Sequence, residues 1–112
     1  MTGIIFYKNK KAGLDMLNII KTRYTNYMFN IQSVHPEEVR ISNGDIWKLV
    51  PATIPMTCGR RCQIAYIERA IDKEIFYSII MPCLTSGPYT AFNFYGEGNL
   101  KVNDQIELPF KR

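Results

Sequence analysis

The chain has 112 residues, of which 46% are hydrophobic and 21% are charged. This length and composition predict one domain, residues 1–112, with a modest hydrophobic core, and they argue against a disordered chain. Fourteen Lys plus Arg against ten Asp plus Glu leave a net charge of +4. That excess is compatible with nucleic acid as a partner, but an ordinary solvated basic surface explains it more simply.

The sequence carries no sign of export or of a membrane span. No run approaches the roughly 20 apolar residues that cross a bilayer, and the N-terminus lacks the apolar segment of a signal peptide. We therefore expect a soluble intracellular protein, in host cytoplasm or nucleus, with no membrane partner. Three cysteines, an odd number, argue against a disulfide framework. The spacing of Cys58, Cys62, Cys83 and His35 disfavours a zinc site and leaves reduced thiols as the expectation.

The first quarter of the chain predicts a strand followed by a helix. Residues 3–7 form a short apolar run of strand length. Asn9 can cap the helix that follows, and an apolar stripe recurs at helical spacing, formed by Leu17, Ile20, Tyr24 and Met28. We expect this stripe to be core packing.

The clearest local signal is Asn43-Gly44 between two strand-like segments, residues 39–42 and 45–50. Because both residues tolerate positive φ, the pair predicts a β-hairpin with a type I′ turn. Trp47 is expected to be a core or half-buried sheet residue, in preference to a stacking platform for a nucleic-acid base.

The second half predicts a buried strand, a helix and a further strand. Residues 62–67 are a nearly continuous apolar run, typical of a strand covered on both faces. Residues 75–81 favour a helix through their i, i+4 isoleucines, although their β-forming residues also allow a strand that pairs antiparallel with 62–67. Residues 90–95 predict a core strand, and the tail, within 100–110, can add an edge strand.

Five segments in this order carry a resemblance. They are residues 3–24, Ile41-Ser-Asn-Gly-Asp-Ile-Trp, Gly59-Arg-Arg-Cys-Gln-Ile-Ala-Tyr-Ile-Glu-Arg-Ala, Met81-Pro-Cys-Leu and residues 90–99. Together they resemble the ATPase domain of the large terminase, the DNA-packaging motor of tailed phages and herpes-like viruses. In that order they resemble its second strand and helix, its hairpin, the segment ending in Walker B, the end of the next helix, and the coupling strand with its loop.

The resemblance covers residues 3–99, leaves 100–112 as a tail, and begins after the point where the family carries its phosphate loop. It implies an α/β fold, a truncated P-loop-like (RecA/terminase-like) three-layer sheet with an inserted β-hairpin in the order β-α-β-β-β-α-β. The strand alternative for 75–81 implies instead an α+β fold, with an antiparallel meander and one long N-terminal helix.

The resemblance gives Glu68 the place of the Walker B-like, magnesium-binding acid. Arg69 stands where the catalytic glutamate would be, and a cation cannot orient water as a carboxylate does. Phe92-Asn93-Phe94 replaces the small hydroxyl residues of the coupling motif. We therefore expect no cofactor and no ATP turnover for the chain alone, with ATP and magnesium bound only beside a partner that supplies the phosphate loop.

Glu68 also has a simpler interpretation, as a strand-end acid paired with Arg69, Arg60 or Arg61. Three explanations cover the whole chain: one piece of a split terminase acting with a partner chain, a degenerate relative kept as a binding module, or an accidental resemblance. A split enzyme is expected to leave an exposed sheet edge near the first strand, whereas a binding module would have closed that edge.

The main rival class is a small viral or mobile-element protein that binds nucleic acid or a host factor without catalysis. Its candidate phosphate contacts are the basic residues interleaved with aromatic ones in the first quarter and a second basic pair, namely Lys8, Lys10, Lys11, Lys21, Arg23, Arg60 and Arg61. A free-standing enzyme has the least support, because His35 is the only histidine and no serine lies in a nucleophile-elbow sequence.

Overall fold

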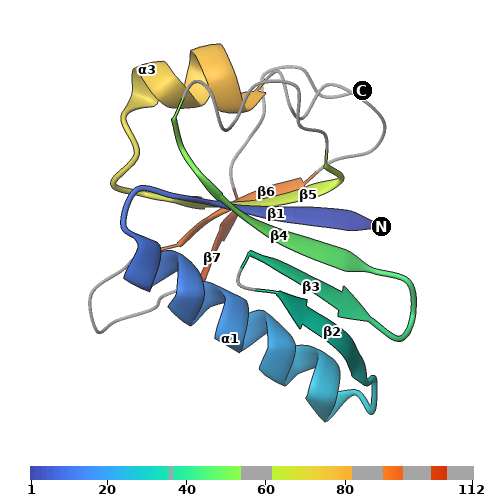
Figure 1. Ribbon diagram of the computed structural model, residues 1–112. Coiled ribbons are helices and arrows are strands. Elements are labelled where there is room, and N and C mark those ends of the chain that lie inside the picture. The colour runs from blue at the N-terminus through green and yellow to red at the C-terminus, as the bar shows by residue number, and fades with distance from the viewer. Residues whose placement is uncertain (36, 54–61, 82–89, 95–101, 106–112) are drawn as a thin grey trace.

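The structure is a computed structural model that describes residues 1–35, 37–53, 62–81, 90–94 and 102–105. Its strands are β1 (Thr2–Tyr7), β2 (Ile31–His35), β3 (Glu38–Ile41), β4 (Ile46–Pro51), β5 (Ile64–Glu68), β6 (Thr90–Phe94) and β7 (Val102–Gln105). Its helices are α1 (Lys10–Asn26) and α3 (Lys73–Ile75), which continues into the π-helical turn η1 (Phe76–Ile80). The strands form one sheet between α1 on one face and α3 with η1 on the other (Figure 1). The α/β class expected from the sequence is confirmed.

The described strands lie in the order β2-β3-β4-β1-β5-β6-β7. The four inner strands β4, β1, β5 and β6 are parallel, whereas β2, β3 and β7 each run antiparallel to a neighbour. α1 lies in the connection from β1 to β4, and α3 with η1 lies in the connection from β5 to β6. Because the two connections leave the β1–β5 pair in opposite directions, right-handed crossovers place their helices on opposite faces.

The strand alternative for residues 75–81 is wrong. Residues 73–80 are helical, and β5 pairs in parallel with β6 on the far side of that helix. Ile80 is fully buried while Tyr77 is 59% exposed, the one-sided burial of a helix that lies on a sheet. The two strands are therefore parallel neighbours joined by a helix, as the favoured interpretation required.

The predicted order β-α-β-β-β-α-β lacks two of the observed strands. It misses β2, because Gln32, Ser33 and His35 interrupt the apolar pattern of a strand that, among the described strands, pairs only with β3. The edge strand that residues 100–110 could add is present as β7, antiparallel to β6. The hairpin was predicted as an insertion. Its second strand, β4, instead pairs in parallel with β1 and belongs to the central sheet.

The hairpin at Asn43-Gly44 is present, with β3 and β4 antiparallel on either side of it. Its turn differs from the prediction: Gly44 has φ 97°, but Asn43 is not among the described residues with positive φ, so the turn is not type I′. The Ile41 N–H donates to the Asp45 carbonyl (2.9 Å), and the Gly44 N–H donates to the Ile41 carbonyl (3.0 Å). These bonds close a three-residue loop, in which one residue at positive φ is sufficient.

α1 begins as predicted. The Asn9 side chain accepts a hydrogen bond from a backbone N–H of the first turn. Leu17 and Ile20 are buried and Tyr24 is half-buried, so these three residues of the stripe contribute to the core. The fourth does not: α1 ends before Met28, which is 89% exposed.

The sheet is buried on both faces. The core under α1 includes Ile5, Met16, Trp47, Leu49, Tyr66 and Phe94. The core under α3 and η1 includes Ile4, Phe6, Ala65, Ile67, Ile80 and Ala91. Trp47 is 4% exposed, which confirms it as a core residue. Its ring crosses β1 above Gly3, where an added Cβ would lie 2.4 Å from a ring carbon, and its centroid lies 5.7 Å from that of Tyr66.

The sheet edge expected near the first strand is not found at β1, because β1 pairs with β4 on one side and β5 on the other. Within the described ranges the outermost strands are β2 and β7, and each of the four parallel strands has a neighbour on both sides. A partner could therefore add a strand beside the parallel core only by displacing β3 or β7.

The described residues bear on the expectations for the cysteines, for a metal site and for a membrane span. Cys62 is buried next to β5, whereas Cys58 and Cys83 lie outside those residues. In the part of the chain that is described, no three His, Cys, Asp or Glu side chains gather closely enough to hold a metal ion. None of the helices described there combines the length and apolar character needed to cross a bilayer.

Candidate functional site

The carboxyl ends of β1 and β5 mark the point at which the connections of the sheet diverge. α1 follows β1 on one face, and α3 follows β5 on the other (Figure 1). In open α/β sheets, ligands usually bind in the crevice outside two such strand ends, with anions held by N–H groups at the start of a helix. This crevice is therefore the first candidate site.

Glu68 fills the crevice with its own side chain. It is the last residue of β5 and is 5% exposed. Its Oε1 accepts hydrogen bonds from the backbone N–H groups of Lys8 (2.8 Å) and Asn9 (2.9 Å), the two residues that join β1 to α1. A carboxylate makes short, strong hydrogen bonds with backbone N–H groups. The protein therefore satisfies internally two donors that would otherwise be available to a bound anion.

These bonds give Glu68 a structural role that neither interpretation of the sequence contained. The residue lies at a strand end, as expected for a Walker B-like acid, but its carboxylate is directed at the β1–α1 turn. Arg60 and Arg61, two of its suggested ion-pair partners, lie outside the described residues. The magnesium role stays a prediction.

A second cavity, of about 240 Å³, opens beside the ends of β5 and β6, and its lining includes Glu68, Arg69, Lys73 and Asn93. Asn93 is the middle residue of the segment that replaces the small hydroxyl residues of the coupling motif. Its neighbours on β6, Phe92 and Phe94, pack into the core under α1. Only the amide of that segment therefore reaches this cavity.

The predicted nucleic-acid contacts lie at two different ends of α1. The side chains of Lys8, Lys10 and Lys11 are exposed at its start, where the Lys11 Nζ lies 3.3 Å from the Asp15 carboxylate. Lys21 lies in the second half of the helix, roughly 15 Å further along its axis at 1.5 Å per residue. The described members of the set therefore form two separate groups.

Arg23, the last described member of the set, is engaged at the far end of α1. Its Nη1 donates a hydrogen bond to the Tyr66 hydroxyl (3.1 Å) on β5. Its side chain lies beside an aromatic pocket, where its charge does not add to the lysine group at the start of the helix. The structure thus assigns Arg23 to a different surface from the one predicted.

This aromatic pocket, of about 260 Å³, lies at the amino end of the parallel strands, between β5, β6 and the second half of α1. Its floor and walls include Ile20, Trp47, Ile64, Tyr66 and Phe92. Tyr66 stacks on Phe92, with ring centroids 5.3 Å apart, and on its other side lies Trp47. A continuous row of rings from β4, β5 and β6 therefore forms the base of the pocket.

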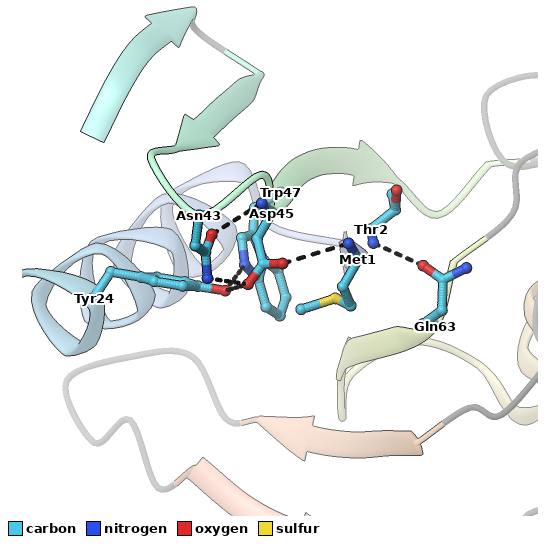
Figure 2. A network of polar contacts seen from close by, with 7 residues as sticks. All are labelled: Met1, Thr2, Tyr24, Asn43, Asp45, Trp47 and Gln63. Carbon is cyan, nitrogen blue, oxygen red and sulfur yellow. Dashed lines mark hydrogen bonds and ion pairs between the residues drawn. The ribbon is translucent and has the colours of Figure 1, made fainter. Parts of the chain in front are cut away.

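Figure 2 shows the polar network that holds one side of this pocket. The Trp47 Nε1 donates to the Tyr24 hydroxyl (2.9 Å), which donates to the Asp45 carboxylate (2.7 Å). The Asn43 side chain also donates to this carboxylate, and the Met1 ammonium group lies 3.4 Å from it. The hairpin turn, α1 and the start of β1 are thus joined through Asp45.

The network changes the acid–base behaviour of its two central groups. Burial, with smaller contributions from Asp45, raises the pKa of Tyr24 to about 12. Burial alone would raise the pKa of Asp45, but hydrogen bonds from Tyr24 and Asn43 and the Met1 ammonium group outweigh it and lower that pKa. Asp45 is therefore held as a carboxylate and Tyr24 as a neutral hydroxyl near neutral pH.

The mouth of the pocket carries three consecutive apolar residues after α1. Tyr27 is 78% exposed, Met28 is 89% exposed and Phe29 is 40% exposed, and both aromatic residues line the pocket. Met28 has φ 69°, a left-handed conformation that favours glycine. We call the residues Tyr27–Phe29 the aromatic rim.

Sequence reasoning missed both the rim and the pocket. Met28 fits the helical stripe by spacing, which made it look like core. A signal was present in Tyr-Met-Phe, an apolar triplet directly after a helix with no glycine to end it.

No protein-family model, curated protein or solved structure matches this chain. The resemblance to the large terminase therefore stays a hypothesis.

Proposed function

We propose that this chain is a non-catalytic binding protein that docks a protein partner at the amino end of its sheet. One observation carries the proposal: the crevice at the carboxyl end is filled by the Glu68 carboxylate, whereas the aromatic pocket at the other end is open and bordered by exposed apolar residues. Exposed apolar surface beside a preformed pocket is typical of protein interaction sites.

Nucleotide binding at the crevice is disfavoured for a physical reason. A phosphate approaching the β1–α1 turn would have to displace a carboxylate that already bonds two backbone N–H groups. It would also bring like charge close to that carboxylate, which costs free energy in a partly buried site. The Glu68 carboxylate thus acts as the internal ligand of its own anion site.

Titration of the purified chain with magnesium and ATP tests this proposal. We expect no saturable binding and no turnover above the background without protein. Magnesium-dependent ATP hydrolysis by the purified chain would contradict it.

The resemblance to the terminase ATPase supplies a second candidate function, a piece of a split DNA-packaging motor. The observation that favours it is the parallel pair β5 and β6 joined by α3 and η1, the arrangement expected for a Walker B-like strand followed by a coupling strand. In this case the fold is P-loop-like and truncated, and a partner supplies the phosphate loop.

The split-motor candidate makes a separate prediction. Mixed with a terminase polypeptide that carries a phosphate loop, the chain should increase ATP turnover, and Glu68→Ala should remove the increase. Hydrogen exchange of the β3 and β7 amides should rise in the mixture, because one of these strands must yield its place. Unchanged turnover and unchanged exchange would contradict this candidate.

Nucleic-acid binding is the third candidate, favoured by the three exposed lysines Lys8, Lys10 and Lys11 at one end of α1. Phosphate contacts of this kind weaken steeply with salt and show little sequence preference. A Lys8, Lys10, Lys11→Gln triple variant should then lose affinity for duplex DNA, while Lys21→Gln should not. Equal losses from both would contradict a site at this end of the helix.

A further inference from the structure

We infer that the aromatic pocket receives a peptide segment that presents an aromatic or branched aliphatic side chain beside one or more carboxylates. This inference rests on the proposed function, because it names the chemistry of the partner that docks there. The size and lining of the pocket, the charge at its side and the conformation of its rim each support it.

The size of the pocket fits side chains better than a cofactor. Its volume of about 260 Å³ lies just below the range of roughly 300–1,000 Å³ that is usual for small-molecule sites. Two polar groups in its wall are already engaged, since the Trp47 Nε1 donates to the Tyr24 hydroxyl and the Tyr66 hydroxyl accepts from Arg23. An apolar side chain can fill such a pocket without leaving a buried polar group unpaired.

Arg23 supplies the charge that selects a carboxylate. Its guanidinium has five N–H donors, and one of them bonds the Tyr66 hydroxyl at 3.1 Å. Among the described residues no carboxylate lies within ion-pair distance of it. A carboxylate on the partner can form a charge-assisted, bidentate pair with this group. The net charge of +4 also favours the approach of an acidic segment.

A nucleic-acid base fits the same pocket less well. The rings at the base of the pocket offer little open face for stacking, because Trp47 is 4% exposed and Tyr66 is 7% exposed, and the Tyr66 ring packs against both Trp47 and Phe92. The three lysines that could follow a phosphate backbone lie at the opposite end of α1. A peptide side chain is therefore the occupant that the geometry favours.

The aromatic rim is arranged for contact rather than for stability. Met28 adopts φ 69°, where glycine would relieve strain of roughly 1 kcal/mol. Its neighbours Tyr27 and Phe29 turn large apolar surfaces to solvent beside the pocket. Strained, exposed apolar residues at the mouth of a pocket are expected where a partner covers them.

The fluorescence of Trp47 provides a direct test, because it is the single tryptophan of the chain and it lines the pocket. The probe is a short synthetic peptide with one phenylalanine between aspartates. Two matched peptides replace the aspartates by lysines or the phenylalanine by alanine. We expect saturable change in emission with the first peptide, about tenfold weaker binding with lysines, and no binding with alanine.

Protein variants locate the binding. Arg23→Gln should weaken the first peptide about tenfold and leave the lysine peptide unaffected. Lys11→Gln, which removes an exposed cation from the other end of α1, is the matched control and should change neither. Tyr27→Ser should weaken all binding, whereas Tyr77→Ser, an exposed aromatic residue on η1, should not. Circular dichroism melting confirms that each variant is folded.

The outcomes separate this inference from the proposed function. Tighter binding of the lysine peptide would overturn the inferred chemistry and leave a protein-binding pocket. Dimers that form through the rim and dissociate in Tyr27→Ser would overturn it in favour of a second copy, and saturable quenching by oligothymidine would overturn it in favour of nucleic acid. Absence of all binding together with magnesium-dependent ATP turnover would remove the proposed function itself.

Discussion

The β1–β5 crevice at the carboxyl end of the parallel sheet is filled, whereas the aromatic pocket at the amino end is not. At the carboxyl end, where α/β proteins usually bind ligands, Glu68 bonds the two N–H groups of the β1–α1 turn and closes the crevice. At the amino end, a row of rings lies under an open pocket bordered by exposed apolar residues. The position of a ligand site therefore does not follow from the fold alone. It depends on which side chains fill or line each opening, since the cavity beside β5 and β6 is lined by the charged side chains of Glu68, Arg69 and Lys73, whereas the pocket at the amino end is aromatic.

The largest expected effect on stability comes from removing the Glu68 carboxylate from the β1–β5 crevice. Glu68→Ala removes the acceptor of two charge-assisted hydrogen bonds and should lower the free energy of unfolding by about 3 kcal/mol. Glu68→Gln keeps one carbonyl acceptor of the same size and should lose less. Urea denaturation of the three proteins measures both changes. Equal stability of Glu68→Ala and the parent would show that these bonds do not hold the crevice closed.

Gly3→Ala should disturb the row of rings at the base of the aromatic pocket. The added Cβ would lie 2.4 Å from the Trp47 ring, so the ring must move away from Tyr66, at an expected cost of about 2 kcal/mol. Trp47 emission should shift to longer wavelength as its surroundings become wetter. Gly44→Ala is the control: open space surrounds it, and its φ of 97° predicts a loss of about 1 kcal/mol with unchanged emission. Unchanged emission in Gly3→Ala would contradict the position of the ring.

Met28→Gly sharpens the comparison because stability and binding should change in opposite senses. Glycine accepts φ 69° without strain, so the free energy of unfolding should rise by up to about 1 kcal/mol. The same change removes an exposed side chain from the rim and should weaken the acidic phenylalanine peptide. Thermal melting and the Trp47 titration give the two values. A less stable variant would contradict the strained conformation.

The smallest expected effects are on the pH dependence of stability, through the polar network beside the aromatic pocket. The pKa of Asp45 is lowered by folding, so its contribution to stability is present above the unfolded value of about 3.9 and is lost as pH falls through the folded value. The pKa of Tyr24 is raised to about 12, so its contribution is present below about 10 and is lost as pH rises toward 12. Asp45→Asn should flatten the acid side of the stability profile and Tyr24→Phe the alkaline side. If the stability profile of either variant matched that of the parent, the replaced residue would not be the source of that pH dependence.

Local patterns in the sequence were enough for much of the fold. The Asn9 cap, the hairpin at Asn43-Gly44 and the helix over 73–80 each depend on neighbouring residues, and the structure contains all three. The strand β2 was missed because its polar residues hide the pattern of an edge strand. The turn type was missed because both two-residue and three-residue loops use Asn-Gly.

The site residues were harder to predict because they depend on distant contacts. The side chain of Glu68 accepts hydrogen bonds from Asn9 and Lys8, which lie 59 and 60 positions away in the sequence. No local pattern indicates that a strand-end acid will bond the turn of another strand. Arg23 was grouped with the lysines by sequence distance, yet the length of α1 separates it from Lys8, Lys10 and Lys11. Periodicity also continued through Met28 after the helix had ended, which concealed the rim.

The most direct test of the contrast between the two ends is an amide ¹H–¹⁵N correlation spectrum of the chain, recorded with the acidic phenylalanine peptide and separately with magnesium and ATP. We expect the peptide to move the resonances of Arg23, Tyr27–Phe29 and Trp47, and we expect magnesium and ATP to leave Lys8, Asn9 and Glu68 in place. Saturable shifts at Lys8, Asn9 and Glu68 with ATP, and none at the rim with the peptide, would contradict it.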